Sequence, residues 1–555
     1  MTINPTTTAL PTTERPARAA ATGRRDVFVG TGALLRLGLR RDRIVATVWI
    51  LLFVAMAAGS ASASQSLFTT MESRLRAAAA VNDTPATLAL YGRVFDPASL
   101  GAVSMFKLGA MGAALVALVA IFTVVRHTRA EEETGRLELI GATVVGRYAA
   151  LTAALLLSVG TTLALALLTA LSLVGAGLPA GGALAFGLSW AGAGIAFAAV
   201  GAVAAQVTES ARTANGLGAA VLATAYVLRA AGDASGVDTS SWLSWLSPIG
   251  WAQQVRPFAG DRWWVLGYLV AFAVLVTVAA YALVARRDHG AGLLAQRPGR
   301  PAAGPRLRTP LALAVRLHRG GLTGWLVGVA LGGLAMGSIA SQVGQFADTP
   351  QARDMIMKLG GQRGLTDAFL SAEMAILALV VSAYGISAAL RLRAEETAGR
   401  AEPILATRVS RLRWAASHVV VALAGTTALM VVIGVGAGFA HGAATGNMAE
   451  IGRVLVAALA QLPAVWVLTG ITIAVSGLAP GLIMIGWGAL VLFLVLGQLG
   501  SVLGLPQWTM DLSPFTHSPK LPGGELSATP LIMLTLIAAI LVTIGLSAFR
   551  RRDIG

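Results

Sequence analysis

The chain has 555 residues, of which 56% are hydrophobic and 12% charged, whereas soluble domains average about a quarter charged residues. A soluble core of this size requires more polar surface, so the composition excludes an ordinary soluble protein and indicates a chain dissolved in a bilayer. The net charge of +16 comes from short basic clusters between apolar runs, without interleaved aromatic residues, which excludes a nucleic-acid partner. There are no cysteines, so disulfides and cysteine metal sites are excluded as well.

Residues 1–26 are rich in Thr, Pro and Ala and lack the apolar stretch of a cleaved signal peptide, so we expect a disordered cytoplasmic tail. Beyond them lie twelve apolar runs, each near the length of about 20 residues that crosses a bilayer as a helix. The predicted spans are 44–64, 103–125, 148–174, 181–205, 211–231, 264–285, 322–343, 372–391, 414–440, 452–477, 481–504 and 530–549. The sequence therefore predicts an all-α polytopic membrane protein with about twelve transmembrane helices.

Four segments beside these spans each allow two interpretations. Val27–Arg43 and Leu311–Arg319 mix leucines with arginines, as does an amphipathic helix that lies at the cytoplasmic interface, but topology-setting arginines explain them equally well. Residues 240–263 and 505–526 carry Trp, Phe and Pro residues. They either anchor the chain at the outer interface or form a small lid of short re-entrant helices.

The basic residues predict the orientation. With both termini in the cytoplasm, 30 of the 42 Lys and Arg residues fall in cytoplasmic loops and helix ends. The 26 acidic residues divide evenly between the two sides, so the bias rests on Lys and Arg, as the positive-inside rule requires. We therefore expect a multi-pass protein of the cell (inner) membrane with an even number of spans.

An internal repeat divides the chain into two halves. Residues 129–147 and 393–411 match at 12 of 19 positions without a gap, and the Arg-Arg-Asp at 286–288 recurs at 551–553. Each half has six spans and returns to the same side, so we expect two parallel six-helix repeats about an axis along the membrane normal. The predicted domains are a first half at 27–287, a cytoplasmic linker at 288–312 and a second half at 313–555.

The two copies of the repeated segment are charged loops that follow the second span of each half. In the first copy Glu132 precedes Arg136 by four residues, the order that favours an ion pair on a helix, and Glu396 and Arg400 repeat this spacing. We therefore expect a short cytoplasmic helix, which runs through Gly135 in the first copy. A solvated loop with incidental charges is the alternative, but the duplication favours a docking element for a cytoplasmic partner with two equivalent subunits.

Motifs of catalysis are lacking in the sequence. It contains no Gly-x-x-x-x-Gly-Lys-Ser/Thr loop for a nucleotide, no His-Glu-x-x-His for a metal and no Gly-x-Ser-x-Gly elbow for a nucleophile. We therefore predict no catalytic residues and no metal site, and expect that the energy for uphill work comes from a partner or from a gradient.

The Glu-Glu-x-x-Gly-Arg-x-Glu of both copies, followed by Ala-Thr-x-Val-x-Arg, resembles the permeases of the ABC-2 exporter family. The fused form with twelve spans is more closely similar to actinobacterial exporters of polyketide antibiotics, the tetronasin-type permeases, and to mycobacterial multidrug-efflux relatives. The resemblance covers nearly the whole chain in topology, and its sequence-specific part is the two loops. It implies an exporter of hydrophobic or amphipathic compounds that uses ATP hydrolysed by a separate ATPase subunit.

The resemblance also implies partners and residue roles. Such permeases pair with an ATPase that dimerises on ATP, so we expect two ATPase copies, with ATP and Mg bound there and no cofactor on this chain. The loop after the second span would be the coupling helix of each half, with a second contact near Glu209. The coupling residues are Glu131, Glu132, Gly135, Arg136, Glu138, Glu209, Glu395, Glu396, Gly399, Arg400 and Glu402. Pro480 replaces the acid of Glu209 in the second half, and Pro403 replaces Leu139, so the two docking sites are expected to differ.

In this family the second and fifth helices of each half line the transport path. The path candidates are Met105, Phe106, Met111, Phe122, Tyr226, Met374, Tyr384, Met484, Trp487 and Phe493. Apolar surfaces with methionines suit varied amphipathic ligands, although helix packing alone explains each of these residues as well.

Two other classes of function compete with an ATP-driven exporter. A proton-coupled drug carrier with two six-helix halves would carry a basic loop after its second helix and buried acids, whereas this chain has an acidic loop and no carboxylate near the middle of a predicted span. A membrane scaffold or sensor would explain the duplicated loops without a transport path.

Overall fold

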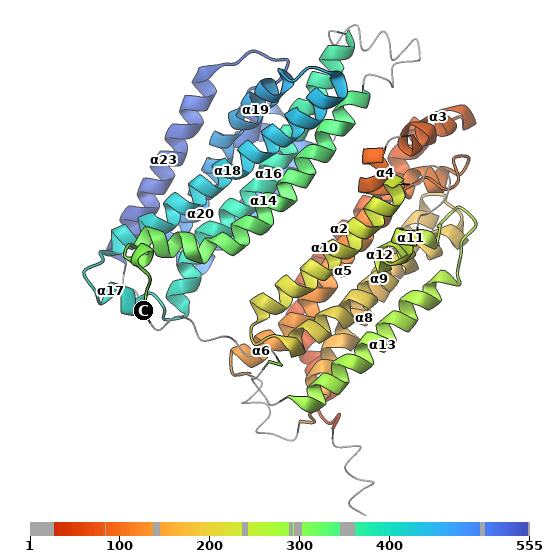
Figure 1. Ribbon diagram of the computed structural model, residues 1–555, viewed down its shortest axis with the longest axis horizontal. Helices are drawn as coiled ribbons and strands as arrows, with labels where there is room; N and C mark the ends of the chain where they lie inside the picture. Colours follow the sequence, from red (N-terminus) through yellow and green to blue (C-terminus); the bar gives the residue numbers. More distant parts are fainter. Residues whose placement is uncertain are drawn as a thin grey trace, which may run out of the picture. The chain divides into compact units, whose positions relative to one another are not determined.

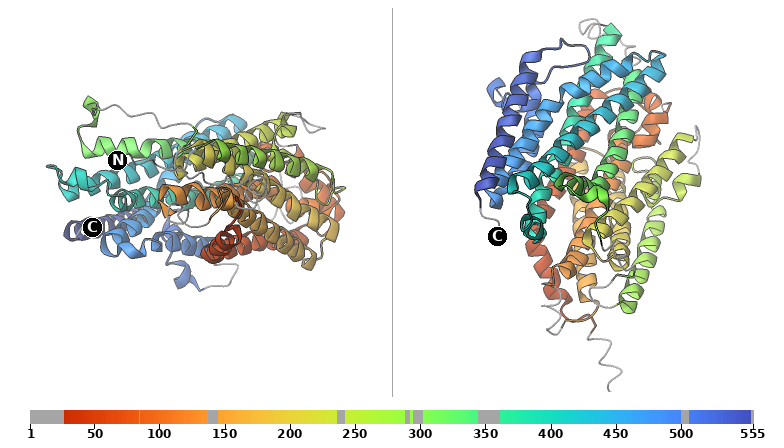
Figure 2. Two further views of the ribbon diagram at one scale, coloured as in Figure 1. Left: turned by 90° about the horizontal axis from the view of Figure 1, so that it is seen from below. Right: turned by 60° about the vertical axis from the view of Figure 1, so that its left-hand side comes forward.

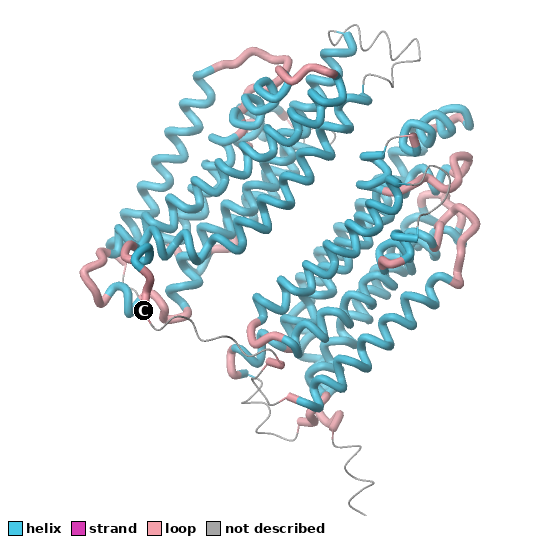
Figure 3. Tube along the Cα trace, viewed as in Figure 1, coloured by secondary structure: helices cyan, strands magenta, loops and turns pink. Residues whose placement is uncertain are grey.

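The computed structural model describes residues 27–83, 85–136, 145–235, 242–287, 292–293, 302–343, 361–499 and 506–552. Within these residues every regular element is a helix (Figure 3), which confirms the predicted all-α polytopic fold. The chain divides into two compact units, Met1–Pro298 and Gly299–Gly555, and each is a bundle of long helices (Figure 1). The predicted N-terminal tail and residues 288–291 and 294–301 of the predicted linker lie outside the described residues.

The helices of the first unit follow the order predicted for a six-span half, with short helices between the long ones. They are α2 (Thr31–Leu67), α3 (Met71–Asn82), α4 (Pro85–Tyr91), α5 (Leu100–His127), α6 (Arg129–Glu133), α8 (Ala149–Gly175), α9 (Ala180–Val207), α10 (Ala211–Ser235), α11 (Trp242–Trp245), α12 (Pro248–Gln254) and α13 (Val265–Arg286).

The second unit repeats this order with local differences. Its helices are η1 (Pro305–Leu307), α14 (Pro310–Val343), α16 (Gly361–Thr397), α17 (Glu402–Leu405), α18 (Arg411–Thr445), α19 (Glu450–Ala460), α20 (Leu462–Leu478), η3 (Pro480–Leu482), α21 (Ile485–Leu499), α22 (Gln507–Met510), η4 (Pro514–His517) and α23 (Ala528–Arg551).

Eleven helical segments among the described residues are long and apolar enough to cross a membrane, when α5 is counted with α6 and α19 with α20. The shorter apolar helix α21 takes the place of the predicted span 481–504. The predicted span 452–477 is divided at Gln461 into α19 and α20, because Pro463 occupies the first turn of α20 and has no N–H to continue the helix.

The structure also describes segments for which the sequence allowed two interpretations. Residues 31–43 and 310–319 are the first turns of the continuous helices α2 and α14, so neither forms a separate helix along an interface. In the segment 240–263, α11 and α12 are short helices, with Trp242 exposed and Ile249 fully buried.

Each unit has two ends, which we name by their residues. The basic end of the first unit holds the start of α2, α6 and the end of α13, and its far end holds α3, α4, α11 and α12 (Figures 1 and 2). The basic end of the second unit holds the start of α14, α17 and the end of α23. The charged loops of the two halves therefore lie at the basic ends.

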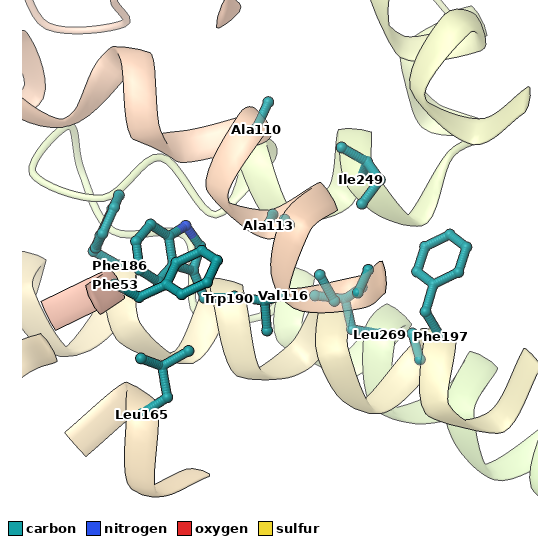
Figure 4. Packing of buried hydrophobic residues seen from close by; sticks show 14 of the residues in the cluster. Phe53, Ala110, Ala113, Val116, Leu165, Phe186, Trp190, Phe197, Ile249 and Leu269 are labelled. Carbon is teal, nitrogen blue, oxygen red and sulfur yellow. The ribbon is translucent and has the colours of Figure 1, made fainter. Parts of the chain in front are cut away.

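The core of the first unit is built around α9, which packs against α5, α8, α10 and α13. Trp190 of α9 is fully buried, and its ring meets Phe53 of α2 edge to face at a centroid distance of 5.6 Å (Figure 4). The indole N–H of Trp190 donates to the Leu108 carbonyl at 3.1 Å, which satisfies a polar group that has no water available.

Glycines let the central helices approach their neighbours at backbone contact. A Cβ built on Gly187 of α9 would lie 2.3 Å from the Ala166 carbonyl oxygen of α8, and a Cβ on Gly477 of α20 would lie 2.3 Å from the Gly545 carbonyl oxygen of α23. Small residues at helix contacts are the usual route to close packing in a bilayer, where hydrophobicity does not drive one helix against another.

We therefore predict that Gly187→Ala destabilises the protein by about 2 kcal/mol, because the added methyl group forces α8 and α9 apart. The measurement is the thermal unfolding midpoint of the purified protein in detergent. The matched control is Gly160→Ala on α8, where a Cβ meets nothing within 4 Å, and which should leave the midpoint unchanged or raise it. Equal midpoints for the two variants would contradict the contact.

Candidate functional site

The charged loop of each unit ends in a glycine turn. In the first unit α5 stops at Thr128, α6 follows, and the Gly135 N–H donates to the Glu132 carbonyl at 3.0 Å. In the second unit α16 continues unbroken to Thr397, and the Gly399 N–H donates to the Glu396 carbonyl at 3.0 Å. Gly135 and Gly399 have φ values of 70° and 67°, the left-handed conformation that ends helices and favours glycine.

The predicted helix through Gly135 is therefore wrong, and so are the predicted ion pairs at four-residue spacing. Because the chain reverses at the glycine, Arg136 pairs with Glu131 at 3.8 Å rather than with Glu132. In the second unit Arg400 pairs with Glu395 at 2.7 Å rather than with Glu396. In each unit the turn therefore pairs the arginine with the glutamate five residues before it, whereas a continuous helix would pair it with the glutamate four residues before it.

Glu132 instead joins three helix ends of the first unit. Its carboxylate pairs with Arg129 of α6 at 2.7 Å and accepts a hydrogen bond of 3.0 Å from Arg287, at the end of α13. Arg287 also donates to the Gln206 side chain at 2.6 Å, and Arg129 donates to the Ala205 carbonyl at 2.9 Å, both on α9. The carboxylate therefore ties α6, α9 and α13 together.

Glu396 has the same role in the second unit. Its carboxylate pairs with Arg393 of α16 at 2.8 Å and accepts a hydrogen bond from Arg552, at the end of α23. Arg552 also donates to the Ser476 carbonyl of α20 at 2.8 Å. We call these two arrangements the carboxylate clamps, one formed by Glu132, Arg129 and Arg287 and the other by Glu396, Arg393 and Arg552.

The clamps explain why two distant motifs recur together in the sequence. Arg287 and Arg552 are each the second arginine of an Arg-Arg-Asp at the end of a half, and each binds the second glutamate of its half's charged loop. The sequence prediction named Glu132 and Glu396 but missed both arginine partners. The sequence signal for these arginines was that the charged loop and the Arg-Arg-Asp both recur in the second half, at nearly the same distance along the chain.

The remaining acids of the first loop contact neighbouring helices. Glu131 pairs with Arg41 of α2, and the Glu133 carboxylate accepts the Ala211 N–H at 3.0 Å, at the start of α10. Glu209 lies two residues before that N–H, in the turn between α9 and α10. The structure therefore brings α6 together with the turn that was predicted as a second contact. Glu138 lies outside the described residues.

The second loop differs in detail. Glu395 pairs with Arg391 of α16 at 2.7 Å in addition to Arg400, and Glu402 is exposed at the start of α17, with Pro403 in its first turn. The turn that corresponds to Glu209 is η3, which begins at Pro480.

Burial separates the predicted coupling residues into two groups. The carboxylates of the clamps are enclosed, with 13% of the Glu132 side chain and 3% of the Glu396 side chain exposed. The Arg136 and Arg400 side chains are 58% and 59% exposed, and Glu402 is also exposed. The enclosed group holds the loop in place, and the exposed group is the one that a partner can contact.

Two buried polar pairs at the basic ends were not predicted. Asp42 of α2 contacts His127 of α5 at 2.7 Å and Arg126 at 3.1 Å. In the second unit the imidazoles of His318 on α14 and His418 on α18 lie 3.3 Å apart. Neither pair has a sequence signal, because each joins helices that are distant along the chain.

The path candidates of the first unit occupy different environments. Met105 and Phe106 line a pocket at the far end, Met111 is half-buried, and Phe122 is 43% exposed. Tyr226 of α10 donates its hydroxyl to the Leu90 carbonyl, which fixes it against α4.

The candidates of the second unit divide in the same way. Met374, Tyr384 and Phe493 are buried in its core, Trp487 packs against that core, and Met484 is 72% exposed. The role of these residues in a transport path stays a prediction.

Comparisons with known proteins extend over both units. Residues 307–550 match the family described as the C-terminal domain of the multidrug efflux system permease Rv1217c. The chain is 47% identical, over 543 residues, to the multidrug efflux system permease protein Rv1217c of Mycobacterium tuberculosis (strain ATCC 25618 / H37Rv). The aligned region covers 97% of this chain and 98% of that protein, so the similarity is not confined to one half.

We predict that Glu132→Ala lowers the stability of the protein by about 3 kcal/mol, because it leaves the buried guanidinium groups of Arg129 and Arg287 without their carboxylate. Thermal unfolding in detergent measures the change, with Glu402→Ala, an exposed glutamate, as a control of unchanged stability. A double-mutant cycle with Arg287→Ala should show that the two losses are not additive. Fully additive losses would mean that the pair contributes nothing.

Proposed function

This chain belongs to the family of multidrug efflux system permeases, and from that membership we propose that it is the permease subunit of an ATP-driven exporter of hydrophobic and amphipathic compounds. It is a multi-pass membrane protein whose helices are long and apolar enough to cross a bilayer.

The observation that carries the proposal is the duplicated basic end. In each unit a carboxylate clamp fixes a glycine turn, and an exposed arginine follows that turn: Arg136 in the first unit and Arg400 in the second. Two similar, rigidly held charged turns in one chain suit a partner that presents two equivalent clefts. Two copies of one ATPase subunit meet that requirement.

The partner is inferred to supply the chemistry as well as the contact. The sequence lacks the glycine-rich loop and lysine that hold nucleotide phosphates, so ATP and Mg would be bound and hydrolysed on the ATPase subunits. This chain would then act as the translocation subunit and would take up the ATPase movement through its charged turns.

The basic ends would face the cytoplasm, with both termini on that side. The first turns of α2 carry Arg36, Arg40 and Arg43, and those of α14 carry Arg316 and Arg319. Arginines at helix ends favour the cytoplasmic side, where they also attract anionic lipid headgroups.

The proposal predicts that reversing the two exposed charges uncouples the complex. Arg136→Glu combined with Arg400→Glu should lower ATP-driven transport at least tenfold, because like charges at a docking contact cost several kcal/mol. The assay is accumulation of a hydrophobic dye in inverted vesicles that contain the chain and its ATPase. The matched control is Arg76→Glu, an exposed arginine of α3 at the far end.

The same vesicles distinguish the competing functions. Transport that follows ATP and fails in the double variant supports the proposal, provided that the variant unfolds at the same temperature as the control. Transport that follows an imposed proton gradient and ignores ATP would establish a proton-coupled carrier instead. Absence of dye movement under both conditions would favour a scaffold or sensor.

A further inference from the structure

The far end of the first unit carries a loop in an unusual conformation. Between α12 and α13, Arg256, Phe258 and Asp261 have positive φ values of 51°, 61° and 33°. Residues other than glycine adopt such angles rarely, and they keep them only where the surrounding structure holds them. Strained backbone of this kind concentrates at binding and catalytic sites.

A phenylalanine wedge holds the loop in place. A Cβ built on Gly101 of α5 would lie 2.5 Å from the Phe258 ring, and a Cβ on Gly182 of α9 would lie 2.2 Å from it. The ring therefore fills a slot that exists only because both positions are glycine. Within the loop, the Phe258 N–H donates to the Asp261 carboxylate at 2.8 Å, which closes the turn.

The loop places an arginine over an aromatic ring beside a pocket. The Arg256 guanidinium lies 4.3 Å from the centroid of the Phe95 ring, and its Nε donates to the Gln254 side chain at 3.1 Å. The pocket lies between α5, α9 and these far-end segments. Its lining includes Tyr91, Arg93, Phe95, Met105, Phe106 and Phe186.

The charges around this pocket are predominantly positive. Burial lowers the pKa of Arg256, and the nearby charges of Arg262 and Arg93 lower it further. Lys107 adds a fourth cation, with its Nζ 5.7 Å from the centroid of the Phe106 ring. Among the carboxylates of this region, Asp261 accepts the Phe258 N–H, Asp96 accepts the Ala98 N–H at 3.0 Å, and Asp233 pairs with Arg229.

We propose that this pocket binds an amphipathic organic anion, with its carboxylate held by Arg93 and Arg256 and its apolar body against Met105, Phe106 and Phe186. The planar guanidinium fork matches a carboxylate, and methionine with aromatic rings accepts apolar bodies of varied shape. The pocket names a substrate class for the exporter and so rests on the proposed function. The strained loop holds Arg256 beside the pocket, with its guanidinium over the ring of Phe95, which is one of the lining residues.

The second unit does not repeat Arg256 and Arg262. Its corresponding segment, residues 505–526, contains no arginine, and its one lysine, Lys520, is exposed. Because Arg256 has no counterpart there, we expect one such anion site per chain, although the chain has two similar halves.

Equilibrium binding to the purified chain tests the site without ATP or a partner. The chain is placed in phosphatidylcholine nanodiscs, and the fluorescence of dansyl undecanoate is compared with that of its methyl ester, which has no charge. Wild type should bind the acid about tenfold more tightly than the ester, at one acid per chain, because a charge-assisted pair is worth about a factor of ten.

Matched variants test whether Arg93 and Arg256 cause the preference for the acid over the ester. Arg93→Gln with Arg256→Gln should bring the ratio of the two affinities close to one, whereas Arg93→Lys with Arg256→Lys should keep part of it. Arg76→Gln removes an exposed arginine from the same end and should keep the whole preference. Equal affinities for acid and ester in wild type, or a preference that survives the glutamine variant, would overturn the proposal.

If the glutamine variant fails to fold, photolabelling of wild type tests where the anion binds. A diazirine-bearing fatty acid should label peptides that contain residues 91–106 and 253–259, and labelling confined to other peptides would overturn the site. ATP-driven transport of a neutral dye is measured in parallel. Intact dye transport without anion binding refutes only this pocket, and anion binding without ATP-driven transport refutes only the proposed function.

Discussion

Pairing of buried charge is the constraint on which the basic ends of both units depend. Only 12% of the residues are charged, and a charge enclosed among apolar helices is costly unless it has a partner. The carboxylate clamps meet this requirement with one glutamate and two arginines in each unit. Each clamp also closes the bundle, because the final helix of the half is held against the central helix at the point where the charged loop begins. The exposed arginine of each turn has a fixed position as a result.

Much of the fold follows from properties that are local in the sequence. Helices that cross a bilayer need a minimum apolar length, so the long runs predicted most of the spans closely. The exceptions are α21, which is shorter than its predicted span, and the span that is divided into α19 and α20. The charged loops were found by their duplication, but their internal pairing was predicted wrongly. The spacing of Glu132 and Arg136 favours an ion pair only if the helix continues, and Gly135 ends it. The true partner, Arg287, is 155 residues away, and no local spacing predicts such a contact.

The far end shows a second limit of sequence reasoning. Gly101, Gly182 and Phe258 are unremarkable separately, and their relation exists only where α5, α9 and the loop after α12 meet. Met105 and Phe106 were named for their position on the second span of the half, but the arginines beside them were assigned only to topology. The two units share the carboxylate clamps at one end, whereas Arg256 and Arg262 of the first unit have no counterpart in residues 505–526 of the second.

The first half has a helix interruption at Thr128 that the second half lacks at the corresponding place. In the first unit α5 and α6 are separate helices, whereas α16 of the second unit is one helix of 37 residues, about 55 Å long, that ends two residues before its glycine turn. If the proposed partner displaced both turns, the unbroken helix α16 would pass the displacement at Gly399 along its whole length. The same displacement at Gly135 would be partly absorbed by bending between α5 and α6. Equal displacements of the two turns would then move the helices of the two halves by unequal amounts.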